Sequence, residues 1–208
     1  MKLTICIPTI VGREKEFDEL FHELCSQNGM EVLANGKREV EILWMRDNKE
    51  MSIGKKRQHL LNNAKGEYIV MIDEDDKVPF DYIHEVLVAL KQRPDCVGYL
   101  EQCKINGHNQ IACHSNRFAD WATNQDGYDY VRTIFCKDVI RTDIARKIGF
   151  SDMRFAEDHY FAKRLKASGL LEKEIFIDKI MYYYTSNTLT PKQHIERYGL
   201  DKDKNYGN

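Results

Sequence analysis

The sequence has little of several features that mark special classes of protein. Only 12 of its 208 residues are glycine and 4 are proline, while 42% are hydrophobic and 31% are charged. This composition excludes a collagen-like or disordered chain and is typical of a folded globule. The formal net charge is only -2, so overall charge does not attract nucleic acid or an anionic membrane.

Cysteine pairs and long apolar segments are also missing. The six cysteines include no CxxC pair, and Cys6 and Cys96 lie in apolar runs that are typical of buried strands. No window approaches the ~20 apolar residues of a membrane span, and no signal-like segment opens the sequence. We therefore expect reduced thiols, no membrane span and a cytoplasmic location.

Two common nucleotide-binding motifs do not occur. The absence of GxxxxGKS/T and of GxGxxG argues against a P-loop and against a dinucleotide-binding fold. The length leaves room for one compact domain with a sizeable core, not for a two-domain enzyme.

The first part of the chain repeats the order strand, loop, helix. Short apolar runs alternate with segments whose apolar residues recur every three or four positions. Such βα units predict an α/β protein with a parallel sheet and right-handed crossovers. The predicted strands are 3–7, ended by Pro8, 40–45 and 68–72, and the predicted helices are 14–28, ended by Gly29, 53–64 and one that begins at Pro79.

The second half is less regular. Asn106-Gly107 predicts a hairpin turn between 102–105 and 110–113. The polar stretch 115–129 predicts a loop. The remaining expectations are strands at 96–100, 134–137, 174–177 and 181–184, and helices at 142–148, 157–168 and 190–198.

Polar residues gather where the first three predicted strands end, which is the ligand-binding edge of an open parallel sheet. Asp73-Glu74-Asp75-Asp76 follows the third strand directly. Neighbouring carboxylates repel one another unless a cation neutralises them, and Mg²⁺ and Mn²⁺ bind one or two carboxylates together with substrate phosphates. The alternative is a solvated acidic turn.

Two further segments are candidates for chemistry. Gly54-Lys55-Lys56-Arg57 opens a helix, where backbone donors and cations can face a diphosphate, although lysine and arginine are also ordinary surface residues of helices. Glu157-Asp158 begins a later helix, where one carboxylate can serve as a general base. Acids also occur at helix starts because they complement the helix dipole.

In this order the motifs resemble those of the family 2 glycosyltransferases of GT-A fold, across residues 3–185. The resemblance implies a Rossmann-like, open and mostly parallel sheet flanked by helices. It assigns donor binding to residues 1–100, an irregular acceptor and catalytic-base half to 101–190, and a C-terminal helix and tail to 191–208. The matching residues are Ile7-Pro8-Thr9, Arg13, Asp47, Gly54-Lys55-Lys56-Arg57, Ala64-Lys65-Gly66-Glu67-Tyr68-Ile69, Asp73-Glu74-Asp75-Asp76, Pro79 and Glu157-Asp158.

The resemblance also implies a reaction. It is the inverting transfer of a sugar from a nucleotide-diphosphate donor, with a UDP-sugar as the expected class, to an acceptor hydroxyl. Asp158 would be the base, and Asp73 and Asp75 of the DxD motif would hold Mn²⁺ or Mg²⁺. Gln58 departs from the asparagine that usually follows the family's arginine. The nucleotide-sugar contacts would be Pro8, Thr9, Arg13, Asp47, Lys56, Arg57 and Asp73.

Two other functions stay open. A nucleotide-sugar binding module without catalysis would share the donor-side residues, and a metal-dependent nucleotidyltransferase would keep the metal site but lacks a glycine-rich, basic segment after the first strand. The expected acceptor is a saccharide or another hydroxyl-bearing molecule; near-neutral charge gives a nucleic acid acceptor no support. His194 is a further candidate metal ligand, although a lone helical histidine is more often a surface residue.

Overall fold

The structure, a computed structural model, describes residues 1–186; the predicted tail helix at 190–198 and His194 lie outside them. A nine-stranded sheet has the order β2-β1-β3-β8-β4-β5-β7-β6, and β9 pairs with β4. The strands are β1 (Leu3–Ile10), β2 (Val40–Asp47), β3 (Tyr68–Met71), β4 (Cys96–Ile105), β5 (His108–His114), β6 (Ala122–Gln125), β7 (Tyr128–Arg132), β8 (Val139–Arg141) and β9 (Glu174–Ser186). The helices are α1 (Glu14–Asn35), α2 (Ile53–Asn63), α3 (Tyr82–Leu90), α4 (Thr142–Ile148) and α5 (Glu157–Ala167).

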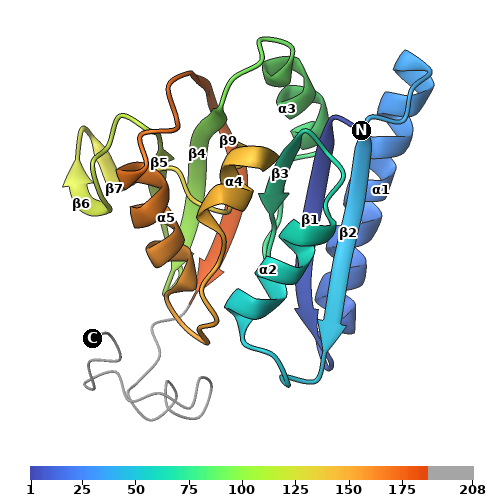
Figure 1. The fold of residues 1–208 in the computed structure, drawn as a ribbon, viewed down its shortest axis with the longest axis horizontal. Helices are drawn as coiled ribbons and strands as arrows, with labels where there is room; N and C mark the ends of the chain where they lie inside the picture. Colours follow the sequence, from blue (N-terminus) through green and yellow to red (C-terminus); the bar gives the residue numbers. More distant parts are fainter. Residues whose placement is uncertain (187–208) are drawn as a thin grey trace.

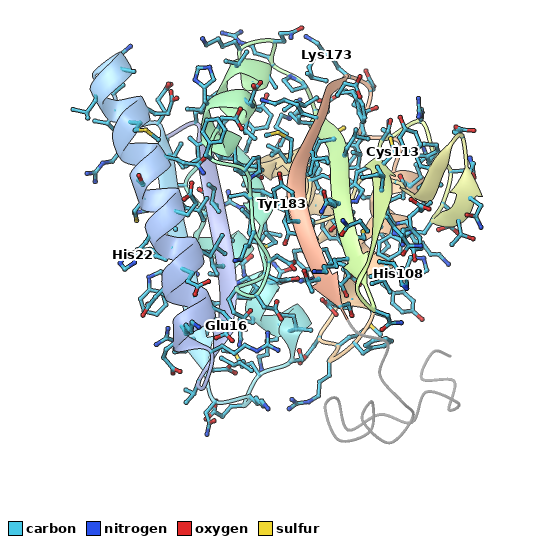
Figure 2. The ribbon with its side chains drawn as sticks, turned by 180° about the vertical axis from the view of Figure 1, so that it is seen from behind. Glu16, His22, His108, Cys113, Lys173 and Tyr183 are labelled. Atoms are coloured by element: carbon cyan, nitrogen blue, oxygen red, sulfur yellow. The ribbon has the colours of Figure 1, made fainter. Side chains whose placement is uncertain are left out.

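Helices cover both faces of the sheet. Figure 1 shows α2, α4 and α5 in front of it, and Figure 2, seen from behind, shows α1 with Glu16 and His22 on the opposite face. Alternate side chains of β1 lie on opposite faces of the sheet. Ile5 and Ile7 pack in the core under α1 and α3, whereas Cys6 packs in the core under α2, α4 and α5. A strand buried on both faces is continuously apolar, which explains the first motif of the sequence.

The predicted parallel units are confirmed. β1 pairs in parallel with β2 and with β3, so the carboxyl ends of all three strands lie at one edge of the sheet. The arrowheads of β1 and β2 point to the lower edge in Figure 1, where α2 begins. The remainder of the sheet is mixed, because β8 joins β3 and β4 as an antiparallel strand.

Three expected bounds were wrong, and one of them is the start of α3, which begins at Tyr82 rather than at Pro79. β1 continues through Pro8 to Ile10, and Pro8 lies opposite Met45 of β2. The pairing with β3 stops at Cys6, so a residue without an N–H is tolerated beyond it. Helix α1 runs past the exposed Gly29 to Asn35, and Gly36 ends it in the left-handed region at φ 69°. An exposed glycine inside a helix costs only about 1 kcal/mol.

In the second half the hairpin is confirmed. Asn106 and Gly107 both have positive φ, 50° and 84°, as a two-residue turn requires. Residues 134–137 are not a strand, and the loop expected at 115–129 contains β6. The two late strands are one continuous strand, β9, which pairs with β4 along its length. The division into donor and acceptor halves stays a prediction.

None of the helices within residues 1–186 is long and apolar enough to cross a membrane.

Candidate functional site

A cavity of about 880 Å³ opens at the carboxyl ends of the parallel strands. Its walls come from the ends of β1 and β9, the start of α2, the acidic segment after β3, and the loop before α5. The predicted site residues on its walls are Pro8, Thr9, Arg13, Lys56, Arg57, Asp73, Asp75 and Asp158. The structure thus brings together Asp75 and Asp158, which come from different halves of the chain.

Arg57 joins two of these walls. Its guanidinium is buried, and it donates from Nη2 to Asp73 Oδ1 at 2.7 Å and from Nη1 to Glu157 Oε1 at 2.5 Å. A planar guanidinium is suited to such a bridge because its nitrogen atoms are fixed in a fork. One side chain of α2 therefore fixes the segment after β3 relative to the start of α5.

Burial acts differently on the two carboxyls that Arg57 holds. For Asp73, burial by itself would raise the pKa, but the positive charges of Arg57 and Lys137 outweigh it and lower the pKa to about 2. For Glu157, burial outweighs Arg57 and raises the pKa to about 7, with the charge of Asp158 adding to the rise. Asp73 is therefore ionised at neutral pH, whereas Glu157 can take up a proton near neutral pH.

Lys56 points inward, as its place on the apolar side of the helix predicts. It donates to Asp47 and, at 2.6 Å, to the backbone carbonyl of Thr9. Asp47 does not line the cavity; its other oxygen accepts the Met51 N–H at 2.8 Å. Its expected role as a nucleotide contact stays a prediction, and in this structure its carboxylate holds Lys56.

The backbone donors at the start of α2 do not face the cavity freely. The N–H of Gly54 donates to the carbonyl of Met153 at 3.0 Å, and the N–H of Lys55 donates to Ser52 Oγ at 3.0 Å. The close approach requires glycine, because a Cβ at position 54 would lie 1.9 Å from the carbonyl oxygen of Ser151. This contact holds the loop that leads into α5.

Arg13 contacts the acidic segment rather than open solvent. Its Nη1 donates to Asp75 Oδ2 at 2.7 Å and to Glu74 Oε1 at 3.1 Å. The Asp75 side chain remains 41% exposed, whereas that of Glu74 is 8% exposed. Asp75 is thus the more accessible carboxylate of the pair.

A buried lysine that the sequence analysis missed lies behind the acidic segment. Lys137 Nζ donates to Asp76 Oδ2 at 2.7 Å and lies 3.7 Å from Asp73 Oδ2. Burial outweighs the charge of Lys137 and raises the pKa of Asp76 to about 7. The one signal in the sequence was a lysine at the end of the apolar run Ile134-Phe135-Cys136.

The catalytic-base candidate follows a strained residue. Ala156, just before α5, has φ 59° and ψ 13°, which is left-handed backbone that alanine rarely adopts. Asp158 lies in the first turn of α5, and its Oδ1 accepts the N–H of His159 at 2.7 Å. Strain of this kind is found at sites whose surroundings impose a geometry.

Several polar groups on the cavity walls lack a salt bridge, or have one atom without a hydrogen bond, within residues 1–186. Thr9 Oγ1 and Arg57 Nε are buried without a hydrogen bond. Lys49 and Arg154 line the cavity and form no salt bridge within residues 1–186; they are linked to each other by a 3.3 Å hydrogen bond from Arg154 Nη1 to the Lys49 carbonyl. Lys49 and Arg154 are exposed, so they add positive charge to the cavity wall.

No protein-family model and no curated protein matches this chain. Solved structures of S. aureus TarS do match it. Residues 1–349 of TarS superpose with a TM-score of 0.63 at 20% identity, covering 94% of this chain and 63% of that one. The same region crystallised with UDP-GlcNAc gives 0.63 at 18% identity and 91% and 60% coverage, and TarS as a whole gives 0.63 at 19% identity and 94% and 38% coverage.

This likeness confirms the expected fold class, an α/β open sheet of GT-A type flanked by helices. The sheet is mixed rather than mostly parallel, because β3–β8, β4–β8, β4–β5 and β6–β7 are antiparallel pairs. The fold resembles that of a glycosyltransferase. The chain spans less than two thirds of each TarS structure.

Proposed function

We propose that this chain is an inverting glycosyltransferase that moves a sugar from a nucleotide-diphosphate donor, a UDP-sugar, to an acceptor hydroxyl. The observation that carries the proposal is the shared cavity, in which Asp75 and the Arg57 bridge face Asp158. Such a transfer needs acidic residues at the end of a parallel strand, cations around them, and a carboxylate on another wall of the cavity.

The donor would bind along the ends of β1 and α2. Arg13, Lys56, Arg57, Lys49 and Arg154 line this part of the cavity or reach it. Lys49 and Arg154 line the cavity and have no carboxylate partner within the described residues. A diphosphate supplies both the negative charge and the acceptor oxygens. The TarS complex with UDP-GlcNAc supports a uridine donor by analogy of fold.

The donor set also fits Mn²⁺ or Mg²⁺. Within residues 1–186 no group of three or more His, Cys, Asp or Glu side chains converges, so these residues alone do not form a cage. Both ions accept one or two carboxylates together with substrate phosphates. Asp75 would be the accessible ligand and Asp73 the second carboxylate of the motif. When bound, the ion supplies positive charge that stabilises the departing diphosphate.

Asp158 would accept the proton of the acceptor hydroxyl. The acceptor oxygen then forms its bond to the anomeric carbon as the bond from that carbon to the diphosphate oxygen breaks, and the electron pair leaves with the diphosphate. A single displacement inverts the anomeric configuration, by the logic that separates inverting from retaining glycoside hydrolysis. Arg57 keeps Asp73 and the start of α5 in place during the step.

The test is a panel of nucleotide sugars with Mn²⁺ or Mg²⁺, in which nucleotide release and the anomeric configuration of the product are measured. The variants are Asp158→Asn and Asp75→Ala, and the matched control is Asp178→Asn, an exposed aspartate of β9.

We expect Asp158→Asn to abolish transfer while UDP binding persists, and Asp75→Ala to weaken metal-dependent activity. Transfer that is unaffected by both substitutions, or a retained anomeric configuration, would overturn the proposal. Donor binding by the wild type without transfer to any hydroxyl acceptor would favour a binding module instead.

A further inference from the structure

Lys137 is a buried cation that lies behind the cavity without lining it. Its side chain is 9% exposed, and its ammonium group lies 2.7 Å from Asp76 and 3.7 Å from Asp73. These two residues are the first and last of the segment 73–76, called the acid turn below. Asp75, the accessible carboxylate, lies between them. One lysine thus holds the acid turn at both ends.

Two tyrosines of β9, Tyr182 and Tyr184, also contact Lys137, and Tyr182 binds both ends of the acid turn. The hydroxyl of Tyr182 donates to Asp76 Oδ2 at 2.7 Å and accepts the N–H of Asp73 at 3.2 Å. Lys137 Nζ lies 4.6 Å from the ring centre of Tyr182 and 4.5 Å from that of Tyr184, within the range of a cation–π contact. Tyr184 itself lines the cavity.

Lys137 is presented by a firmly held turn. The carbonyl of Cys136 accepts the N–H of Met71 in β3 at 2.9 Å, and the hydroxyl of Tyr99 donates to the carbonyl of Lys137. Asp138, fully buried, accepts the N–H of Phe135 at 2.9 Å. The backbone that carries Lys137 is therefore anchored to β3 and β4, outside the acid turn.

We propose that Lys137 is a positioning residue of the transfer reaction, which fixes the acid turn so that Asp73 and Asp75 face the donor site. The inference rests on the proposed function. Without the ammonium group, Asp76 keeps the Tyr182 hydroxyl and Asp73 keeps Arg57, but the side-chain link from Lys137 to the two ends of the acid turn is lost. The turn would then be free to shift, and a displacement near 1 Å can lower the rate of a reaction by about 100-fold.

The test compares Lys137→Met and Lys137→Arg with a matched control, Lys179→Met. Lys179 also contacts two carboxylates, Asp81 at 2.6 Å and Glu85 at 2.7 Å, but its side chain is 46% exposed. Tyr182→Phe is a second probe that removes the hydroxyl and keeps the ring. For each folded variant, kcat, the donor KM and amide hydrogen exchange across residues 73–76 are measured.

We expect Lys137→Met to lower kcat by about 100-fold with a change in KM of less than about threefold, because positioning acts on the transition state rather than on ground-state binding. Exchange across the acid turn should become faster. Lys137→Arg should recover at least about a tenth of the lost rate, and Tyr182→Phe should lower kcat in the same direction by about 10-fold. Lys179→Met should change neither quantity.

Exchange across residues 73–76 that stays at the wild-type rate in both Lys137→Met and Tyr182→Phe would overturn the inference, whatever the activity. An unchanged kcat in both variants would overturn it as well. A wild-type chain that transfers no sugar from any donor would count against the proposed function, and the exchange experiment would still decide whether Lys137 holds the acid turn.

Discussion

Arg57 of α2 and Glu157, the first residue of α5, form a buried ion pair of 2.5 Å although 100 positions separate them in the sequence. The pair connects the segment predicted to bind the donor with the segment predicted to carry the base. Because Arg57 also donates to Asp73, three walls of the cavity share one guanidinium. The geometry of the site therefore depends on a long-range contact rather than on a local motif.

Replacement of Arg57 by lysine should be nearly as harmful as its removal. An ammonium group is a point charge and cannot keep the two forked hydrogen bonds to Asp73 and Glu157. Arg57→Met leaves buried carboxylates without their partner, so we expect unfolding free energy to fall by about 3–5 kcal/mol. Denaturant unfolding and kcat/KM are the measurements.

Arg141→Lys is the control for this experiment. Arg141 also contacts two acids, Asp95 and Asp143, but its side chain is 40% exposed. Surface ion pairs contribute at most about 1 kcal/mol. Full activity of Arg57→Lys, or equal losses of stability at the two arginines, would contradict the role of the bridge.

Gly54 and Gly29 should respond to alanine in opposite directions. A Cβ at Gly54 would lie 1.9 Å from the backbone oxygen of Ser151, which cannot move without displacing the loop before α5, so Gly54→Ala should destabilise the fold by about 1–3 kcal/mol. Gly29 is an exposed helical residue with nothing within 4 Å of the added carbon. Gly29→Ala should stabilise by up to about 1 kcal/mol.

Thermal melts and transfer rates of both variants check this pair. Gly54→Ala should also lose activity, because the displaced loop carries the residues that precede Asp158. If Gly54→Ala melts at the wild-type temperature, the close contact with Ser151 does not constrain the loop.

The parts of the fold that local patterns specify were predictable from the sequence. The first three βα units have apolar runs and helical periodicity, and the hairpin at Asn106-Gly107 has its turn chemistry in two residues. Residues 134–137 were misassigned because an apolar run of that length fits a strand and a buried turn equally well. Pro8 and Gly29 predict the ends of their elements, but β1 pairs with β2 through Pro8, and α1 continues through Gly29 because an exposed helical glycine costs only about 1 kcal/mol.

The sequence predicts several residues that line the cavity, but not the contacts between them. Asp73, Asp75 and Asp158 were named, and the cavity joins them. The pairing of Arg57 with Glu157 and of Lys137 with Asp76 could not be read from one sequence, because partners that are 100 and 61 positions apart leave no periodic trace. Lys49 and Arg154 are not predicted as site residues for a different reason, since exposed cations carry no distinguishing pattern in the sequence.

His114 should make stability depend on pH. Its ring is fully buried between Asp138 and Glu101, 3.0 Å from each. Burial alone would lower the pKa of His114, but the two carboxylates outweigh it and raise the pKa from 6.5 to about 9. The folded state thus binds the proton more tightly than the unfolded state, so this contribution is full below pH 6.5 and is lost as pH rises through 9.

Protonation of His114 contributes at most about 3 kcal/mol to the free energy of unfolding. Urea unfolding at several pH values between 6 and 10 measures it, for the wild type, His114→Gln and the control His108→Asn, an exposed histidine. His114→Gln should be less stable at pH 6.5 and should lose the decline between pH 6.5 and 9. A decline of the same size in His114→Gln would assign it to other groups.

Lys49 and Arg154 should distinguish a diphosphate from the nucleoside that carries it. Both side chains line the cavity, both are exposed, and within residues 1–186 neither forms a salt bridge, so their charge is available to a ligand. The double variant Lys49→Gln/Arg154→Gln should bind UDP about 10-fold more weakly, since two charge-assisted contacts are lost, and should bind uridine as the wild type does. The difference in UDP affinity between the wild type and the double variant should shrink as salt is raised, because exposed charges are screened.

Lys55→Gln, which removes an exposed cation of α2 outside the cavity, is the control. Equal weakening of UDP and uridine would mean that the two side chains shape the cavity rather than bind phosphate, and calorimetric titration of each variant with both ligands decides between these outcomes.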